Sequence, residues 1–136
     1  MSTRAVYTFI DKRERDQMKA TEFHVYKHHD GYPSGAIQWI KRAIDYAWTL
    51  PRFEASEFSA AFIAANKPLP TESPYSGGGV YCTKHYDDHG DLEYRYEIRC
   101  INGELEITCV PYFGDQKIFK GTLQEFEDFI KTNEGY

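Results

Sequence analysis

The sequence has few cysteines, no long apolar run and no excess of positive charge. Its three cysteines are Cys82, Cys100 and Cys109, and none of them belongs to a Cys-x-x-Cys pair. This pattern argues against a disulfide scaffold or a zinc finger and predicts free thiols in a reducing cytoplasm. No run reaches the roughly 18 apolar residues that cross a bilayer, and residues 11–16 are charged, which is atypical of a signal peptide. We therefore expect a cytoplasmic protein that does not associate with membranes.

Charge is distributed unevenly along the chain. The net charge is −5, with nine Lys/Arg and six Asp/Glu in residues 1–52, against seven and fifteen in residues 53–136. The first part therefore carries +3 and the second part −8. An extended nucleic acid is not expected as a partner, because it requires a positive footprint. A small anionic ligand suits the first part. The acidic second part suits contact with a host protein, and a homo-oligomer is a further option.

Aromatic residues are abundant, with 22 among the 136 residues. Disordered chains are poor in aromatics, so we expect a folded chain, and this length predicts one domain over residues 1–136. Alternation and turn residues predict strands at 5–10, 22–28, 80–86, 92–101 and 104–111, with a short sixth at 116–120. Helical spacing and a capping box at Thr122 predict helices at 35–49, at 54–66 and after residue 122, and residues 67–79 read as a flexible Pro/Gly-rich loop.

The strand groups predict an α+β fold. Its mainly antiparallel sheet has five to six strands, with two central helices and a carboxy-terminal helix. Asn102-Gly103 is a two-residue hairpin signal that pairs Ile98 with Ile107. Extended to the strand at 80–86, the same register places Cys82, Tyr96 and Cys109 in one row. In the helix at 35–49, Ile37, Ile40, Ile44 and Trp48 form one apolar stripe, and Trp39, Ala43 and Tyr46 form a second, which we expect to be buried.

The strongest candidate site combines the first strand with the turn at residues 30–35. If the first two strands are antiparallel, Arg4 lies near His28, beside a helix N-terminus that favours anions. Gly31 and Gly35 would let a ligand approach the backbone, and an aromatic side chain could stack on a base or sugar. The alternative is a structural corner in which Asp30 pairs with Arg4. The candidate ligand-binding residues are Arg4, Tyr26, His28, Asp30, Tyr32, Ser34 and Gly35.

Two segments of this region carry a resemblance. The opening Ser2-Thr3-Arg4-Ala5 and the later Tyr26-x-His28-x-Asp30-Gly31-Tyr32-Pro33-Ser34-Gly35 resemble a group of small phage and bacterial proteins. Members begin with a Thr-Arg-Ser or Thr-Arg-Ala strand and carry an Asp-Gly-Tyr-Pro turn. The match covers about the first 35 residues, and residues 85–94 are similar to the closer bacterial members. The resemblance implies a shared compact domain and no particular activity, and a phage origin would favour a counter-defence role.

A second candidate is a set of histidines and carboxylates. His85, Asp87 and His89 lie close together in sequence, and such donors suit metals that hydrolyse phosphoesters. No His-Glu-x-x-His motif accompanies them, and a solvated hairpin tip is the alternative interpretation.

The sequence thus favours a non-catalytic domain, without a cofactor, that binds a small anionic and nucleotide-like ligand. The alternatives are a metal-dependent phosphohydrolase and an acidic module that inhibits or binds another protein.

Overall fold

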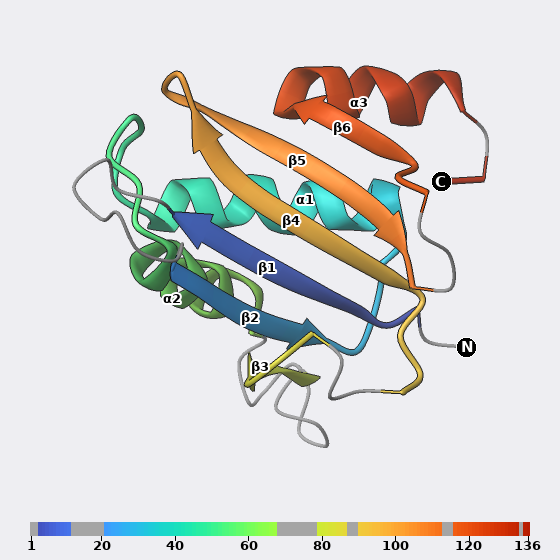
Figure 1. Ribbon diagram of the computed structural model, residues 1–136, viewed down its shortest axis with the longest axis horizontal. Helices are drawn as coiled ribbons and strands as arrows, with labels where there is room; N and C mark the ends of the chain where they lie inside the picture. Colours follow the sequence, from blue (N-terminus) through green and yellow to red (C-terminus); the bar gives the residue numbers. More distant parts are fainter. Residues whose placement is uncertain (1–2, 12–20, 68–78, 87–89, 113–115, 134) are drawn as a thin grey trace.

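The computed structural model describes residues 3–11, 21–67, 79–86, 90–112, 116–133 and 135–136. Its elements follow the predicted order, with six strands and three helices in these residues (Figure 1). The strands are β1 (Ala5–Asp11), β2 (Thr21–Lys27), β3 (Val80–Thr83), β4 (Tyr94–Ile101), β5 (Glu104–Pro111) and β6 (Phe119–Thr122). The helices are α1 (Pro33–Tyr46), α2 (Ala55–Asn66) and α3 (Leu123–Thr132). Apart from residues 67 and 79, the predicted flexible loop lies outside the described residues.

The strands form one sheet in the order β3-β2-β1-β4-β5-β6. The β1–β4 pair is parallel, and the other four pairs are antiparallel. The predicted α+β class, with its mainly antiparallel sheet, is therefore confirmed. No helix of the described residues is long and apolar enough to cross a membrane.

The register of the β4–β5 hairpin follows the prediction. Ile98 pairs with Ile107, and Arg99 pairs with Glu106. Asn102 and Gly103, which join the strands, both have positive φ, 52° and 81°. Two successive positive φ angles are what a tight hairpin turn needs to match the strand twist. A local turn signal therefore fixed the register of this pair.

The place of β3 differs from the prediction. Cys82 does share one row with Tyr96 and Cys109, but the row also crosses Val25 and Tyr7. At ~4.8 Å per strand, four strand spacings put the two cysteines roughly 19 Å apart. The prediction set the strand at 80–86 directly beside the strand at 92–101, which would put the two cysteines only two strand spacings apart. The physical reason is β1, whose residues are buried on both faces, so that it lies inside the sheet, with β2 and β3 beyond it.

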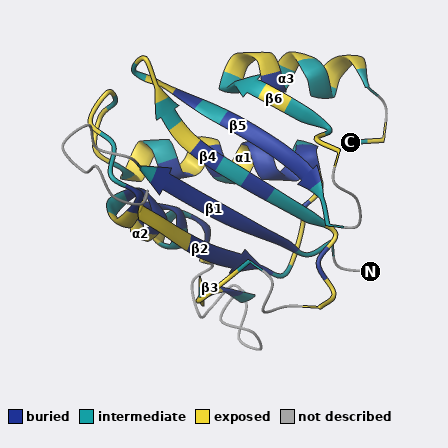
Figure 2. Ribbon diagram, in the orientation of Figure 1, coloured by how far each residue is buried: buried dark blue, intermediate teal, exposed yellow. Residues whose placement is uncertain are grey.

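All three helices cover the same face of the sheet. Tyr7, Phe9 and Tyr96 point into a core that also contains Phe62 of α2 and Phe126 of α3. The rings of Tyr7 and Phe62 lie 4.6 Å apart, centroid to centroid. Figure 2 shows the central strands as the most deeply buried part of the sheet. We call the opposite side of the sheet the helix-free face, because none of the described helices covers it.

Helix boundaries differ from the predicted ones mainly at α1. Pro33 occupies the first turn, where a proline fits because no amide hydrogen bond is lost. The helix ends at Tyr46 rather than residue 49, since the Trp48 amide donates to the Glu57 carboxylate of α2. Tyr46 is 64% exposed, so the expected burial of the second apolar stripe is wrong at this residue. The predicted capping box at Thr122 is present and starts α3.

Candidate functional site

Arg4 and His28 lie together at one end of the helix-free face, as the strand register predicted. Arg4 Nε is 3.3 Å from His28 Nδ1, and the Tyr26 hydroxyl is 2.8 Å from the same nitrogen. Arg4 Nε also forms an ion pair with Asp91 Oδ2 at 3.1 Å. The ring of Tyr81 lies 5.0 Å from that of Tyr26. We call these five residues the Arg4 cluster.

The protonation of His28 follows from its two neighbours. An arginine Nε always carries a hydrogen, so Nδ1 of His28 is the acceptor and the ring proton resides on Nε2. The Tyr26 hydroxyl then donates to the same nitrogen. Burial, followed by the charges of Arg4 and His29, lowers the pKa of His28, while Asp91 acts in the opposite direction. His28 is therefore neutral at pH 7 and holds Arg4 in place.

Tyr26 and Tyr81 give the cluster an aromatic side. Tyr26 is buried and Tyr81 is 46% exposed. Burial, then the charge of Asp91 and the neighbouring Tyr81, raises the pKa of Tyr26, whereas Arg4 lowers it. The phenol of Tyr26 consequently stays protonated and serves as a donor. Tyr81 presents an accessible ring next to that of Tyr26.

The turn at residues 30–35 does not join this cluster. Gly31 packs against the core side, where an added Cβ would lie 2.6 Å from the Ala5 Cβ, and its carbonyl accepts from the buried Tyr96 hydroxyl. The ion pair that the structure shows for Arg4 is with Asp91, so the predicted pairing of Arg4 with Asp30 is wrong. The Asp30 carbonyl instead accepts from the indole of Trp39 on α1.

The N-terminus of α1 offers less to an anion than the sequence suggested. Pro33 has no N–H, and the amides of Gly35 and Ala36 both donate to the Tyr32 carbonyl. An added Cβ at Gly35 would lie 2.3 Å from the Asp30 carbonyl oxygen, so this glycine serves chain packing rather than ligand approach. The predicted site is thus divided. Arg4, Tyr26 and His28 share the helix-free face, while Asp30, Tyr32, Ser34 and Gly35 belong to the turn that leads into α1.

Arg95 is a further residue of the helix-free face, and the sequence analysis did not include it in the candidate site. It shares one row with Tyr81, Tyr26 and Val6. Its guanidinium lies 4.3 Å from the ring centroid of Tyr86, and its side chain is only 24% exposed. Among the described residues its Nε is buried and has no hydrogen-bond partner. Only the strand order could have shown that Arg95 and Tyr26 share a row.

The alternative metal set is only partly described. His85 lies with its ring 5.8 Å from that of His24, and Asp87 and His89 fall outside the described residues. Within the described part of the chain, no group of three His, Cys, Asp or Glu side chains could hold a metal ion. His24 is instead bound to Thr8, with 2.8 Å between Nδ1 and Oγ1.

The three cysteines are free thiols in different surroundings. Burial raises the pKa of Cys109 to about 12, and the Tyr96 hydrogen bond offsets only part of this effect. Burial also raises the pKa of Cys100. A catalytic thiol needs the opposite shift, so neither of these two residues suits nucleophilic chemistry.

The chain was compared with known protein families, curated proteins and solved structures. No protein-family model, curated protein or solved structure matches this chain. The resemblance of the first 35 residues to small phage and bacterial proteins therefore remains a prediction.

Proposed function

We propose that this chain is a non-catalytic domain that binds a small anionic ligand on the helix-free face, through Arg4. The observation that carries the proposal is the position of Arg4, whose side chain is 31% exposed and whose counter-ion, Asp91, is 57% exposed. An ion pair this open to water contributes little to stability. A ligand phosphate, with its higher charge, can therefore replace Asp91 at low cost.

The geometry of the cluster favours a phosphate or carboxylate. A guanidinium recognises such groups through a planar fork of donors. His28 accepts from Arg4 Nε, which fixes the orientation of that fork before a ligand arrives. Arg95 supplies a second cation in the Tyr26 row, with an unpartnered Nε among the described residues.

The exposed Tyr81 favours a ligand with a ring. A base can stack on an accessible aromatic side chain, which contributes ~1–3 kcal/mol per base. Tyr81 is itself backed by the Tyr26 ring. Phosphate beside Arg4 and a ring over Tyr81 together describe a nucleotide-like ligand.

The arrangement supports binding rather than turnover. His28 is the member of the Arg4 cluster best suited to general-base chemistry near pH 7, but its Nδ1 already lies within hydrogen-bond distance of two donors. That nitrogen is therefore occupied in positioning Arg4.

Isothermal titration of mono-, di- and cyclic nucleotides against wild type and Arg4→Ala tests the proposal. A charge-assisted contact is worth ~1.5–3 kcal/mol, so Arg4→Ala should weaken binding by roughly 10- to 150-fold. Arg42→Ala is the matched control, since Arg42 lies over Trp39 on the helix side. If no phosphorylated compound binds, or if Arg4→Ala binds as well as wild type, the proposal is wrong, and an acidic protein-interaction module becomes the leading alternative.

A further inference from the structure

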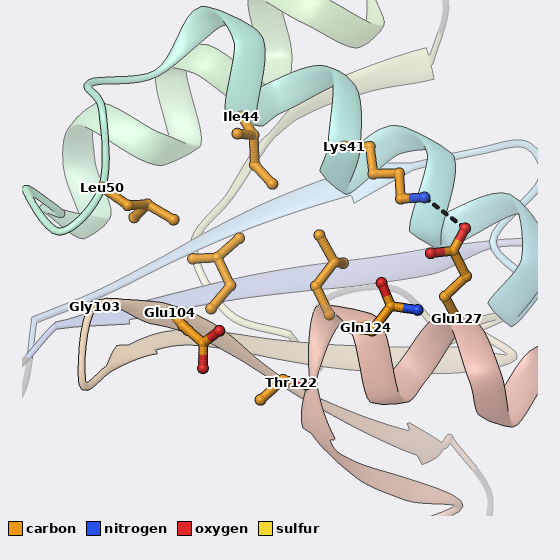
Figure 3. A pocket seen from close by; sticks show the side chains of 10 residues that line it. Lys41, Ile44, Leu50, Gly103, Glu104, Thr122, Gln124 and Glu127 are labelled. Atoms are coloured by element: carbon orange, nitrogen blue, oxygen red, sulfur yellow. Dashed lines mark hydrogen bonds and ion pairs between the residues drawn. The ribbon is translucent and has the colours of Figure 1, made fainter.

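A cavity separate from the Arg4 cluster lies between α1, α3 and the tip of the β4–β5 hairpin. It has a volume of about 360 Å³, within the range of small-molecule sites. Figure 3 shows α1 on one side of the gap, with the hairpin and the start of α3 on the other. The cavity is built from the helix side of the sheet, so it does not share residues with the Arg4 cluster.

The cavity walls are mainly apolar. They are formed by Ile44 of α1, Leu50 after it, Leu105 of β5 and Leu123 of α3. Leu105 is buried, whereas the other three are half-buried. The cavity is partly open to solvent, so water borders these apolar side chains. An apolar group that enters it therefore gains both contacts and removal from water.

One end of the cavity carries a pair of opposite charges. Lys41 Nζ of α1 donates to Glu127 Oε1 of α3 at 2.7 Å, and both side chains remain partly exposed. The Lys41 hydrogen bond lowers the pKa of Glu127, so Glu127 is charged at pH 7. Gln124 lies beside them, and its side-chain amide donates a hydrogen bond to the Asp128 carboxylate. The carboxylate of Glu104 lies at the opposite end of the cavity (Figure 3).

We infer that this cavity binds a free α-amino acid with a large apolar side chain. The ligand carboxylate would pair with Lys41, its ammonium with Glu127, and its side chain would enter the apolar space. A zwitterion suits this end of the cavity because, when it comes between Lys41 and Glu127, it offers an opposite charge to each of them. A ligand with one charge can pair with only one of these two residues, whereas a zwitterion pairs with both.

The size of the cavity favours a large side chain. At about 360 Å³, the cavity is near the lower end of the range of small-molecule sites, roughly 300–1,000 Å³. Phenylalanine has twelve non-hydrogen atoms, and eight of them, the six ring carbons, the methylene and the α-carbon, extend from the charged groups into the cavity or border it. Phenylalanine is therefore the probe of choice, and its singly charged analogues share the same ring.

The test compares three probes on the full chain by isothermal titration or ligand-detected NMR. They are L-phenylalanine, phenethylamine, which lacks the carboxylate, and 3-phenylpropionate, which lacks the ammonium. We expect saturable binding of phenylalanine and at least tenfold weaker binding of the other two. Lys41→Met and Glu127→Gln should each weaken phenylalanine binding about tenfold. Arg42→Met and Asp45→Asn, which remove one charge each elsewhere on α1, should leave it unchanged.

The exposed positions of these substitutions keep the test interpretable. Circular dichroism and the melting temperature of each variant establish that it is folded. Equal affinity for all three probes, tightest binding of the amine or the acid, or no saturable binding of phenylalanine would each overturn the inference. Because the site is independent of Arg4, Arg4→Ala should bind phenylalanine like wild type.

Discussion

Arg4 and His28 are 24 positions apart in the chain, yet Arg4 Nε lies 3.3 Å from His28 Nδ1. The antiparallel β1–β2 register, in which Ala5 pairs with Lys27, brings them together just beyond the last paired residues. Since the guanidinium keeps its protons, this contact exists only while Nδ1 of His28 is unprotonated. The arrangement of the Arg4 cluster therefore depends on pH.

The first prediction concerns this pH dependence. The pKa of His28 is lower in the folded chain than in the unfolded chain, where it is ~6.5. The unfolded chain thus binds a proton more readily, so the stability associated with His28 is complete above pH ~6.5 and is lost as the pH falls toward the folded pKa. The melting temperature of wild type should fall more between pH ~7.5 and ~5.5 than that of His28→Asn.

Asparagine is the matched replacement because its side-chain oxygen can accept from Arg4 and Tyr26 but does not titrate. The other histidines are present in both proteins and cancel in the comparison. Parallel melting-temperature profiles for the two proteins over this range would contradict the assignment of His28 as a neutral acceptor.

The second prediction concerns thiol reactivity. Cys82 is exposed, whereas Cys109 is buried and its pKa is raised to about 12. The thiolate is the reactive form, so Ellman's reagent should modify Cys82 rapidly in the native protein and leave Cys109 unmodified. In denaturant without reductant the titration should count three thiols. Cys82→Ser should remove the rapid phase, and a count of one thiol would contradict three free cysteines.

The third prediction tests the core face of β4. Ile98 is fully buried, opposite Ile107 and Phe9. Ile98→Asp places an unpaired charge in this core and should cost several kcal/mol, on the order of 3 or more, in the free energy of unfolding measured with urea. Because that variant can fail to fold, Ile98→Ala, with an expected loss of ~2–5 kcal/mol, provides a second measurement. Arg99→Ala, on the neighbouring exposed position, should cost less than ~1 kcal/mol, and similar losses at both positions would refute the face assignment.

The fourth prediction separates the two halves of the proposed ligand. Tyr81→Ala removes the exposed ring and should weaken nucleotide binding by ~1–3 kcal/mol, while inorganic pyrophosphate, which has no base, should bind as before. Tyr46→Ala is the control, because Tyr46 is the more exposed residue and lies on α1. Equal losses for nucleotide and pyrophosphate in Tyr81→Ala would show that no base stacks on this ring.

Several features of the protein were determined locally and were therefore readable from the sequence. Asn102 and Gly103 impose the left-handed backbone of a tight turn, and this alone aligns Ile98 with Ile107. Thr122 and Glu125 bond each other's backbone amides within one helical turn. Such signals act over a few residues, through sterics and hydrogen bonds that do not depend on the rest of the chain. The α+β class followed from the same kind of evidence.

The tertiary structure alone decided the strand order, and with it the composition of the candidate site. Strand order depends on how the apolar surface of the whole chain is best buried, and no short segment carries that information. The doubly buried β1 occupies the inside of the sheet, which sends β3 to the far edge and brings Tyr81 to Tyr26. The same order sets Asp91, rather than Asp30, against Arg4. Alternation along a strand predicts which side chains share a face, but the neighbours across that face are fixed only when the strands pack together.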